Sequence, residues 1–349
     1  MNDLPHENDP PRANGLPPEN GSSHRDGSSH RNGLPRETGD RPPVVAAVDG
    51  SGHSLRALSW ALGAAEALGA PLVVAHVRSE ALQLGAARIA SLGTEPELPD
   101  TVLDAVRTVV EERGHAVPVR YDSLDGAVTE VLPAVARGAR LLVTGSRGHG
   151  GFASLLLGST GRSLAARSPC PLVVVPHEAR TASLDSGPGA GRVLLGLHPG
   201  ETPDEAVDFA FETAGLRRVP LEALTVLRLP PNPAALVAAP SPALQVPPPL
   251  PLADDTEELL AEARREQEAR LRPFARRWPS VELVRTVAPG DAGGLLVDAS
   301  GEAALLVVGR HHRHRIADLL VGSVAHAVLH HAACPVAVVP PAPGARGRA

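Results

Sequence analysis

Short runs of valine, leucine and alanine recur along the first half of the chain. Continuous apolar runs of this length are typical of strands in a parallel sheet that is buried on both faces. Five such strands are predicted, at residues 43–48, 71–77, 117–121, 140–145 and 171–175.

Between these runs, apolar residues fall on one face of a helix. The first predicted helix carries four of them at helical spacing: Leu55, Leu58, Leu62 and Ala65. It should end at Gly69, and two further helices with the same spacing should end at Gly114 and Gly138. The alternation of strands and helices predicts an α/β fold with a parallel sheet.

The chain contains an internal repeat. The segment VVAAVDGS (44–51) matches VLLGLHPG (193–200), and CPLVVVP from Cys170 matches CPVAVVP from Cys334. The offset grows from 149 to 164 residues between these matches, so the second copy holds an insertion of 15 residues. This insertion falls in the proline-rich stretch 229–252, which predicts a surface loop.

The repeat predicts two tandem doubly wound, Rossmann-like domains, each a five-stranded parallel sheet with helices on both faces. We assign them to residues 42–178 and 192–341, joined by a linker at 179–191. The segments 1–41 and 342–349 are predicted to be disordered tails. The first is rich in Pro, Gly, Asn and Ser and has almost nothing to bury.

The start of the first helix in the second copy is marked by its own sequence. Thr202 and Glu205 stand three residues apart, the spacing of a capping box in which each side chain binds the other residue's backbone N–H. Pro203 suits the first helical turn because it has no N–H that would need a partner.

Composition limits the function. The chain has 349 residues, of which 43% are apolar, and its net charge is −6. This balance offers no basic surface for nucleic acid or for an anionic membrane, so neither is expected as a partner. All 33 basic residues are arginines, which excludes a Walker-type phosphate loop because that loop requires lysine.

Two features predict the compartment. No apolar run reaches the roughly 18 residues that span a bilayer, and the amino terminus shows no hydrophobic signal segment, so we expect a cytoplasmic protein. Cys170 and Cys334 lack CxxC partners and precede apolar runs, so we expect small buried residues rather than redox or metal ligands. Abundant Arg and Ala without Lys indicate a GC-rich bacterial genome.

Ligands of doubly wound sheets bind outside the carboxyl ends of the strands, where the strand order reverses. Asp49 begins the loop after the first strand, and Gly145 to Gly148 form the loop after the fourth. After nine intervening residues, Gly158 begins a helix. We expect these three segments to face one another.

The residue types in these segments suit a phosphate. Gly145 and Gly148 lack β-carbons, so backbone N–H groups there can approach an anion. The helix that starts at Gly158 offers free amides and the positive end of its dipole. Each glycine alone also has an ordinary explanation as a loop or cap residue, and only the combination indicates nucleotide binding.

Side chains beside these glycines add polar groups. Ser159 and Thr160 carry hydroxyl donors at the start of the helix. The chain has no lysine, so Arg147 and Arg162 are the positively charged side chains of this segment that could reach a phosphate.

The pattern GxxG, nine residues, then GS resembles the ATP-binding signature of the universal stress protein family. The resemblance covers residues 43–176 and 192–340. It implies a five-stranded sheet, ATP bound across the strand ends and pairing of the domains through their last strands. It also implies a role in stress survival as a nucleotide-dependent binding or regulatory module, without a defined reaction.

The resemblance assigns an ATP site to Val48, Asp49, Val77, Gly145, Arg147, Gly148, Gly158, Ser159 and Thr160. In this assignment Asp49 accepts a hydrogen bond from the ribose or the adenine edge, and the backbone at Val77 borders the adenine. Mg²⁺ could accompany the ATP.

The second copy departs from the pattern, and we expect a degenerate nucleotide site there. His198 replaces Asp49, and His312 replaces Gly148, although Gly309, Gly322 and Ser323 remain. We expect this copy to pair with the first and support it. His311, His312 and His314 could instead form a metal site, but they lack the usual ligand spacing, so no metal is assigned.

Two alternatives to an ATP-binding module stay open. A slow Mg-dependent ATP hydrolase would need a second carboxylate placed to help Asp49, and the sequence shows none. A nucleotide-free scaffold would have two vestigial pockets. The sequence also leaves open a homodimer formed through exposed faces and an unknown protein partner.

Overall fold

The computed structural model describes residues 41–78, 99–147, 157–176, 191–229, 253–310 and 322–342. The predicted tails, the linker and the loop insertion fall almost wholly outside these ranges. Both repeats belong to one compact unit, residues 33–349.

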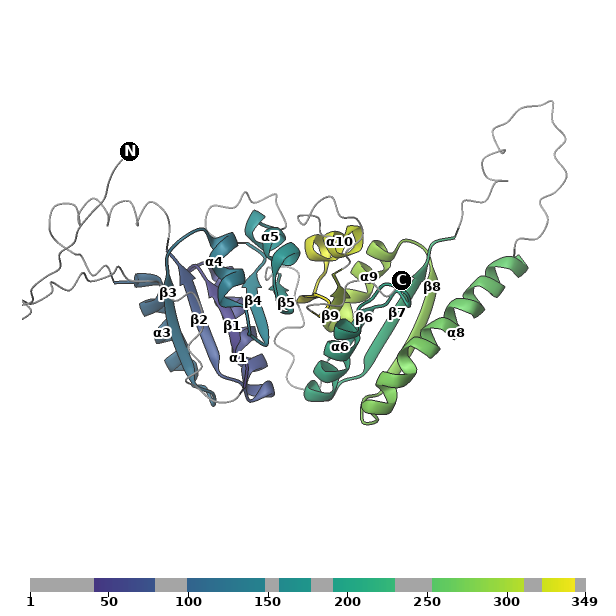
Figure 1. Cartoon of the computed structure of the whole chain (residues 1–349), viewed down its shortest axis with the longest axis horizontal. Coiled ribbons are helices and arrows are strands. Elements are labelled where there is room, and N and C mark those ends of the chain that lie inside the picture. Colours follow the sequence, from purple (N-terminus) through teal and green to yellow (C-terminus); the bar gives the residue numbers. More distant parts are fainter. Residues whose placement is uncertain are drawn as a thin grey trace, which may run out of the picture. The chain divides into compact units, whose positions relative to one another are not determined.

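The first repeat contains the five predicted strands (Figure 1). They are β1 (Val44–Val48), β2 (Leu72–Val77), β3 (Val119–Leu124), β4 (Leu141–Gly145) and β5 (Leu172–Val175). Its described helices are α1 (Gly52–Leu68), α3 (Thr101–Arg113), α4 (Val128–Val135) and α5 (Ser159–Arg167).

Strand β3 lies later in the chain than predicted. The sequence places a strand at 117–121, whereas β3 begins at Val119 and ends at Leu124. Its residues are half-buried or exposed because β3 pairs with β2 alone and forms an edge of the sheet. A search for continuous apolar runs therefore misses the polar residues Asp122 and Ser123.

The second repeat follows the same order. Its strands are β6 (Arg192–Gly196), β7 (Leu221–Leu227), β8 (Leu283–Pro289), β9 (Ala303–Gly309) and β10 (Val336–Val339). Its described helices are α6 (Asp204–Arg217), α8 (Ala253–Arg277), α9 (Ala292–Ala299) and α10 (Ser323–His331), and a short 3₁₀ helix, η2 (Ser300–Glu302), precedes β9.

The capping box predicted at the start of α6 is wrong. Helix α6 begins at Asp204, Pro203 is its N-cap, and the described residues provide no side-chain cap. The Thr202 hydroxyl instead accepts a hydrogen bond of 2.9 Å from the backbone N–H of His198. Thr202 therefore shapes the loop after β6 rather than the helix.

The described strands form one sheet in the order β3-β2-β1-β4-β5-β10-β9-β6-β7-β8. Neighbours within each repeat are parallel, which confirms the predicted α/β class. The last strands of the two repeats, β5 and β10, pair antiparallel, with Ala337 opposite Val173. This is the pairing that the resemblance implied.

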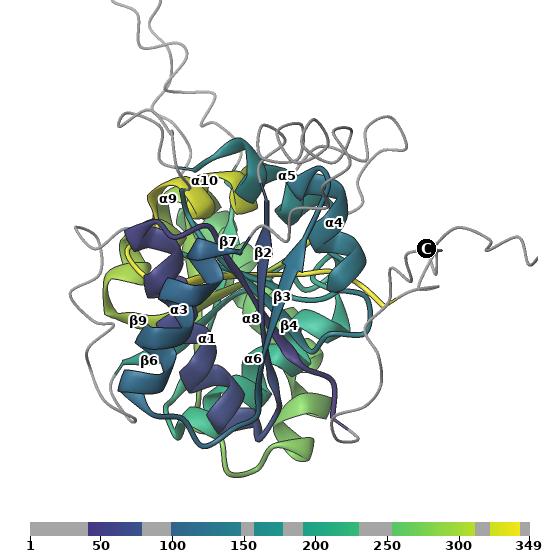
Figure 2. The ribbon, with the colours of Figure 1, turned by 90° about the vertical axis from the view of Figure 1, so that its left-hand side faces the viewer.

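Helices cover both faces of the sheet (Figure 2). One face packs α1, α3, α6 and α8 around a core that includes Leu58, Val106, Phe211 and Leu271. The other face packs α4, α5, α9 and α10 around Leu132, Leu164, Leu296 and Val328. The buried residues are almost all aliphatic.

The strand order reverses once in each repeat. In the first repeat β2 and β3 lie on one side of β1, and β4 and β5 lie on the other. The reversal point is therefore the gap between the carboxyl ends of β1 and β4, where doubly wound sheets bind ligands. The second repeat has the corresponding point between β6 and β9.

Candidate functional site

The loop after β1 is shaped by Asp49. Its Oδ1 accepts a hydrogen bond of 3.0 Å from the backbone N–H of Ser51, and its own N–H donates to Ser54 Oγ at 3.3 Å. Gly50 has φ 80°, in the left-handed region that favours glycine. The carboxylate is therefore held at the carboxyl end of β1 by its own loop.

Gly145, at the end of β4, packs directly against the first turn of α1. A β-carbon at this position would lie 2.8 Å from the carbonyl oxygen of His53. Packing therefore requires glycine here whether or not a phosphate is present. This reason differs from the close phosphate approach inferred from the sequence, and the ATP contact of Gly145 stays a prediction.

The start of α5 is tied to the loop after β4. The backbone N–H of Gly158 donates to Ser146 O at 3.0 Å, and that of Ser146 donates to Val175 O at 2.9 Å. A β-carbon at Gly158 would meet only Ser146 O, at 3.8 Å, among the described residues. The space in front of Gly158 is thus not filled by the described part of the protein.

The amino terminus of α5 is suited to an anion. The first N–H groups of a helix have no acceptor within it, and here they belong to Ser159, Thr160 and Gly161. Arg162 is the first residue whose N–H returns to Gly158 O, at 3.2 Å. The first turn has no acidic residue, and the described residues provide no side-chain cap. No side chain of the described residues therefore occupies the positive end of this helix dipole, which attracts anions.

The two predicted cations differ. Arg147 is half-buried, and its Nε is buried without a hydrogen-bond partner among the described residues. Arg162 is exposed. Gly148 lies outside the described residues, whereas the other eight predicted ATP contacts lie at or beside the carboxyl ends of β1, β2 and β4 or at the start of α5.

A polar cluster that the sequence did not predict lies beside Val77. His76 Nδ1 is 2.8 Å from both carboxylate oxygens of Asp100, and Ser123 Oγ donates to Asp100 Oδ2 at 2.6 Å. Asp100 Oδ1 also accepts from the N–H of Leu103, at 3.1 Å, and so caps α3. A histidine inside the apolar run LVVAHV was the available signal.

The cluster favours the ionised form of Asp100. Burial opposes ionisation, but hydrogen bonds from Ser123, His76 and the Leu103 N–H outweigh it, so the pKa of Asp100 lies below its usual range. The carboxylate therefore joins the carboxyl ends of β2 and β3 to the start of α3. Val77 is the last residue of β2 and pairs with Leu124 of β3, so the cluster lies directly beside it.

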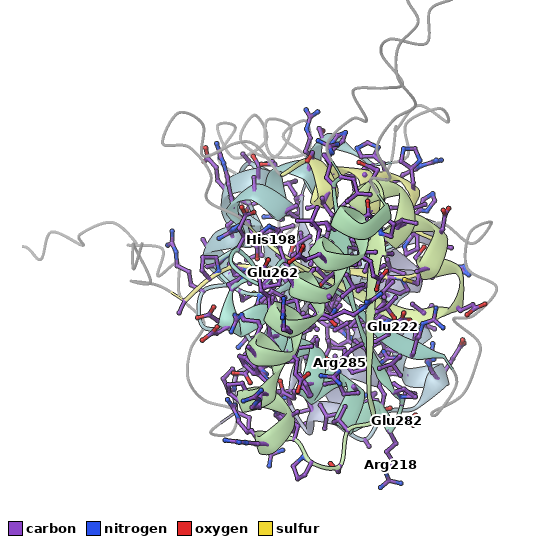
Figure 3. The ribbon with its side chains drawn as sticks, turned by 90° about the vertical axis from the view of Figure 1, so that its right-hand side faces the viewer. His198, Arg218, Glu222, Glu262, Glu282 and Arg285 are labelled. Atoms are coloured by element: carbon purple, nitrogen blue, oxygen red, sulfur yellow. The ribbon has the colours of Figure 1, made fainter. Side chains whose placement is uncertain are left out.

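The second repeat keeps the loop after its first strand but changes the chemistry. The N–H of His198 (labelled in Figure 3) is held by Thr202 Oγ1, as that of Asp49 is held by Ser54 Oγ. His198 is exposed. An imidazole thus replaces the carboxylate on a similarly held backbone.

The glycines of the second repeat parallel those of the first. A β-carbon at Gly309 would clash with the Pro203 ring at the start of α6, so packing requires this glycine too. A β-carbon at Gly322 would meet nothing within 4 Å among the described residues. Ser323 opens α10, which has no side-chain cap from the described residues. His311, His312 and His314 lie outside the described residues.

The family model described as "Universal stress protein family" matches residues 41–176 and again residues 190–340. The chain belongs to the universal stress protein family. The two matched segments correspond to the two repeats.

Curated relatives extend across both repeats of this universal stress protein. A universal stress protein of Mycolicibacterium smegmatis is 29% identical over 308 residues, covering 85% of this chain and 97% of the relative. One of Mycobacterium tuberculosis (strain H37Rv) is 29% identical over 311 residues, covering 84% of this chain and 96% of the relative. The tandem arrangement is therefore shared by these relatives.

A solved structure has the same fold. The crystal structure of a universal stress protein from Archaeoglobus fulgidus superposes with a TM-score of 0.56 at 18% identity, covering 85% of this chain and 98% of that one. This likeness supports the α/β architecture of the present universal stress protein.

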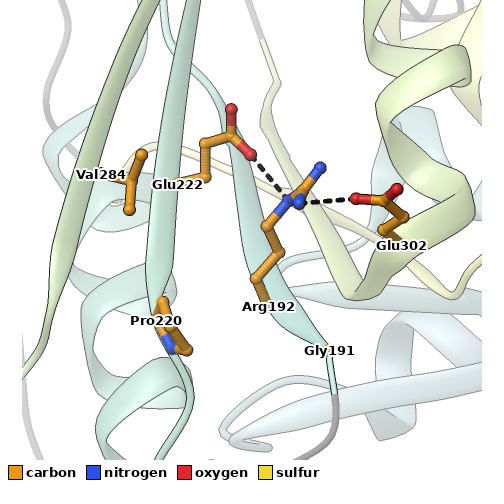
Figure 4. A pocket seen from close by; sticks show the side chains of 6 residues that line it. All are labelled: Gly191, Arg192, Pro220, Glu222, Val284 and Glu302. Carbon is orange, nitrogen blue, oxygen red and sulfur yellow. Dashed lines mark hydrogen bonds and ion pairs between the residues drawn. The ribbon is translucent and has the colours of Figure 1, made fainter.

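A hollow of about 410 Å³ lies in the second repeat near the amino ends of β6, β7 and β9, away from the carboxyl ends where the nucleotide site is expected (Figure 4). Its charged side chains pair with one another: Arg192 Nε lies 2.7 Å from Glu222 Oε2, and Arg192 Nη1 donates to Glu302 at 2.9 Å. We therefore assign no ligand to it in this universal stress protein.

The described part of this universal stress protein offers neither a metal cluster nor an exposed thiol. The described residues contain no group of three or more His, Cys, Asp or Glu that could hold a metal ion. Cys170 and Cys334 are free and buried, as predicted, and burial raises their pKa to about 11 and about 12. No described helix is long and apolar enough to cross a membrane.

Proposed function

We propose that the first repeat binds ATP between the carboxyl ends of β1 and β4, and that the protein acts in the bacterial cytoplasm as a nucleotide-dependent regulatory module under stress. The observation that carries the proposal is the start of α5. The first amides of α5 have no acceptor among the described residues, which also leave the front of Gly158 open. Ser146, after β4, holds Gly158 by a hydrogen bond to its N–H. This arrangement suits a phosphate group.

The remaining contacts follow from position. Asp49, held at the end of β1, would accept a hydrogen bond from the ribose or the adenine edge. Val77 ends β2, the neighbour of β1, and its backbone would border the adenine. Ser159 and Thr160 would donate from their hydroxyls to the phosphates, and Arg147 would add positive charge.

We propose one nucleotide per chain. In the second repeat His198 replaces the Asp49 carboxylate, and Val324 replaces the Thr160 hydroxyl in the first turn of α10. The second repeat would therefore lack an acceptor for the nucleoside and one donor to the phosphates. Mg²⁺ would accompany the ATP, because Mg²⁺ in proteins is held largely by substrate phosphates and water.

A pair of matched variants tests this proposal. Gly158 and Gly322 precede α5 and α10 with φ −70° and −56°, which valine also adopts, and the described residues leave open space in front of both. Gly158→Val should place two methyl groups where the phosphates would lie and weaken ATP binding at least about tenfold. A loss of about 1.4 kcal/mol of binding free energy gives this factor. Gly322→Val should leave affinity unchanged.

The measurement is calorimetric titration of the intact protein with MgATP. The proposal expects one site per chain, which is weakened by that factor in Gly158→Val and lost in a variant that combines Asp49→Ala with Gly148→His. Absence of binding to the unmodified protein, or equal effects of the two valine variants, would overturn it.

A further inference from the structure

Arg310 follows β9 at the position that Ser146 occupies after β4. The backbone N–H of Ser146 donates to Val175 O at 2.9 Å, and that of Arg310 donates to Val339 O at 2.8 Å. These two backbone N–H groups are therefore held in the same way. The side chains differ: a buried serine in one repeat corresponds to a half-buried arginine in the other.

The Arg310 side chain crosses into the first repeat. Its Nη1 donates to Ala166 O at 3.1 Å and to Ser168 O at 2.7 Å. These carbonyls belong to the carboxyl end of α5, which ends at Arg167 with Ser168 as its C-cap. Helix α5 is the helix whose other end forms the phosphate position of the proposed ATP site.

A cation is favourable at this end of a helix. The last carbonyls of α5 lack partners within the helix and carry the negative end of its dipole. Among the described residues Arg310 forms no ion pair with a carboxylate, and its desolvation lowers the pKa of the guanidinium. Its Nη1 hydrogen bonds go to the α5 carbonyls, whereas its buried Nε has no partner among the described residues.

Two other side-chain contacts between the repeats do not involve α5. Arg140 pairs with Glu212 of α6, and the Arg217 guanidinium of α6 lies 5.5 Å from the centre of the Trp60 ring of α1. Helices α1 and α6 pack on the opposite face of the sheet from α5. Among the described residues, hydrogen bonds from the second repeat to α5 come from Arg310.

We propose that Arg310 is a positioning residue that the second repeat supplies to the ATP site of the first. By binding the carboxyl end of α5, it fixes a nine-residue helix about 13 Å long, so that the amides at its other end stay in place for the phosphates. This inference rests on the proposed function. It gives the altered loop of the second repeat a role in the site of the first.

The test compares Arg310→Gln, Arg310→Lys and the unmodified protein. In calorimetric titrations with MgATP, Arg310→Gln should bind about five- to tenfold more weakly, a modest coupling between distant positions. Arg310→Lys keeps the charge but not the geometry for two carbonyls, so it should restore part of the affinity. Hydrogen exchange of the nucleotide-free protein should be faster along α5 in Arg310→Gln and unchanged along α10.

Arg217→Gln is the matched control. It also removes a half-buried arginine that joins the repeats, but this residue contacts α1 rather than α5. It should leave ATP affinity and α5 exchange unchanged. Equal weakening in Arg217→Gln and Arg310→Gln would indicate a general effect of the interface and overturn the inference.

The outcomes separate the two proposals. If the unmodified protein binds ATP and Arg310→Gln binds it equally well, the positioning role of Arg310 is wrong and the proposed function is supported. If the unmodified protein binds no ATP, both the proposed function and the inference are wrong.

Discussion

Gly145 and His53 approach each other so closely that a β-carbon on Gly145 would lie 2.8 Å from the His53 carbonyl oxygen. The neighbour is backbone at the start of α1, which cannot move as a flexible side chain would. Because β4 and α1 both contribute to the core, a larger residue at position 145 would disturb the packing of the first repeat.

We therefore expect Gly145→Ala to lower the free energy of unfolding by about 1–3 kcal/mol, the usual cost of overpacking. Gly309→Ala, which meets the Pro203 ring, should cost a similar amount. Urea unfolding checks both, with Gly158→Ala as the control because a β-carbon there would meet no described atom closer than 3.8 Å. Equal stability of all three variants would contradict the packing explanation.

Asp100 should make stability depend on pH. Its folded pKa is depressed, so its contribution is present above the unfolded pKa of about 3.9 and is lost as pH falls through the lower, folded value. Asp100→Ala removes a helix cap and the partner of His76 and Ser123, which should cost about 2 kcal/mol at neutral pH.

The measurement is urea unfolding of both proteins from neutral pH to about pH 3. The difference between them should shrink as the pH falls below about 4. A difference that stays constant over this range would show that the carboxylate charge contributes nothing. Asp104→Ala, an exposed residue of the same helix, serves as the control.

Gln267 of α8 should be needed to hold β7 and β8 together. Its Nε2 lies within 3.0 Å of Ala223 O, Thr225 Oγ1 and Thr286 O, and the residue is buried. Gln267→Leu leaves these acceptors without the amide and should lower the free energy of unfolding by about 2 kcal/mol. The same change at Glu266, which is exposed, should have little effect in thermal unfolding.

The two thiols should be inert in the folded protein. Burial raises the pKa of Cys170 to about 11 and that of Cys334 to about 12, so little thiolate forms near neutral pH. A chromogenic disulfide reagent should label both cysteines rapidly in guanidinium and only at the rate of unfolding in buffer. Rapid labelling of the native protein would refute this expectation.

The sequence predicted the buried parts of the fold better than its edges. Strands such as β1 and β5 are buried on both faces, so their apolar runs are continuous and their bounds nearly match. β3 is an edge strand with polar residues, and its position was wrong by two to three residues.

Side-chain partners were harder to predict than strands. Thr202 stands at capping spacing, yet its hydroxyl oxygen accepts from the His198 N–H. The backbone N–H groups of the loop after β6 compete with those of the helix start for this oxygen. Asp100 lies 24 positions from His76 and 23 from Ser123. The parallel pairing of β2 with β3 sets His76 opposite Ser123, and the start of α3 brings Asp100 to both. The positions of Asp49 and Gly158 could be predicted, because both follow from where strands and helices begin and end.

The antiparallel pairing of β5 with β10 has a consequence for stoichiometry. Two separate copies of a domain must meet by diffusion, and a mixture of two kinds would also form like-with-like pairs. Covalent linkage makes the encounter intramolecular, so dilution does not weaken it and every pair contains one repeat of each kind. The two repeats can then diverge in sequence, because each always remains paired with the other.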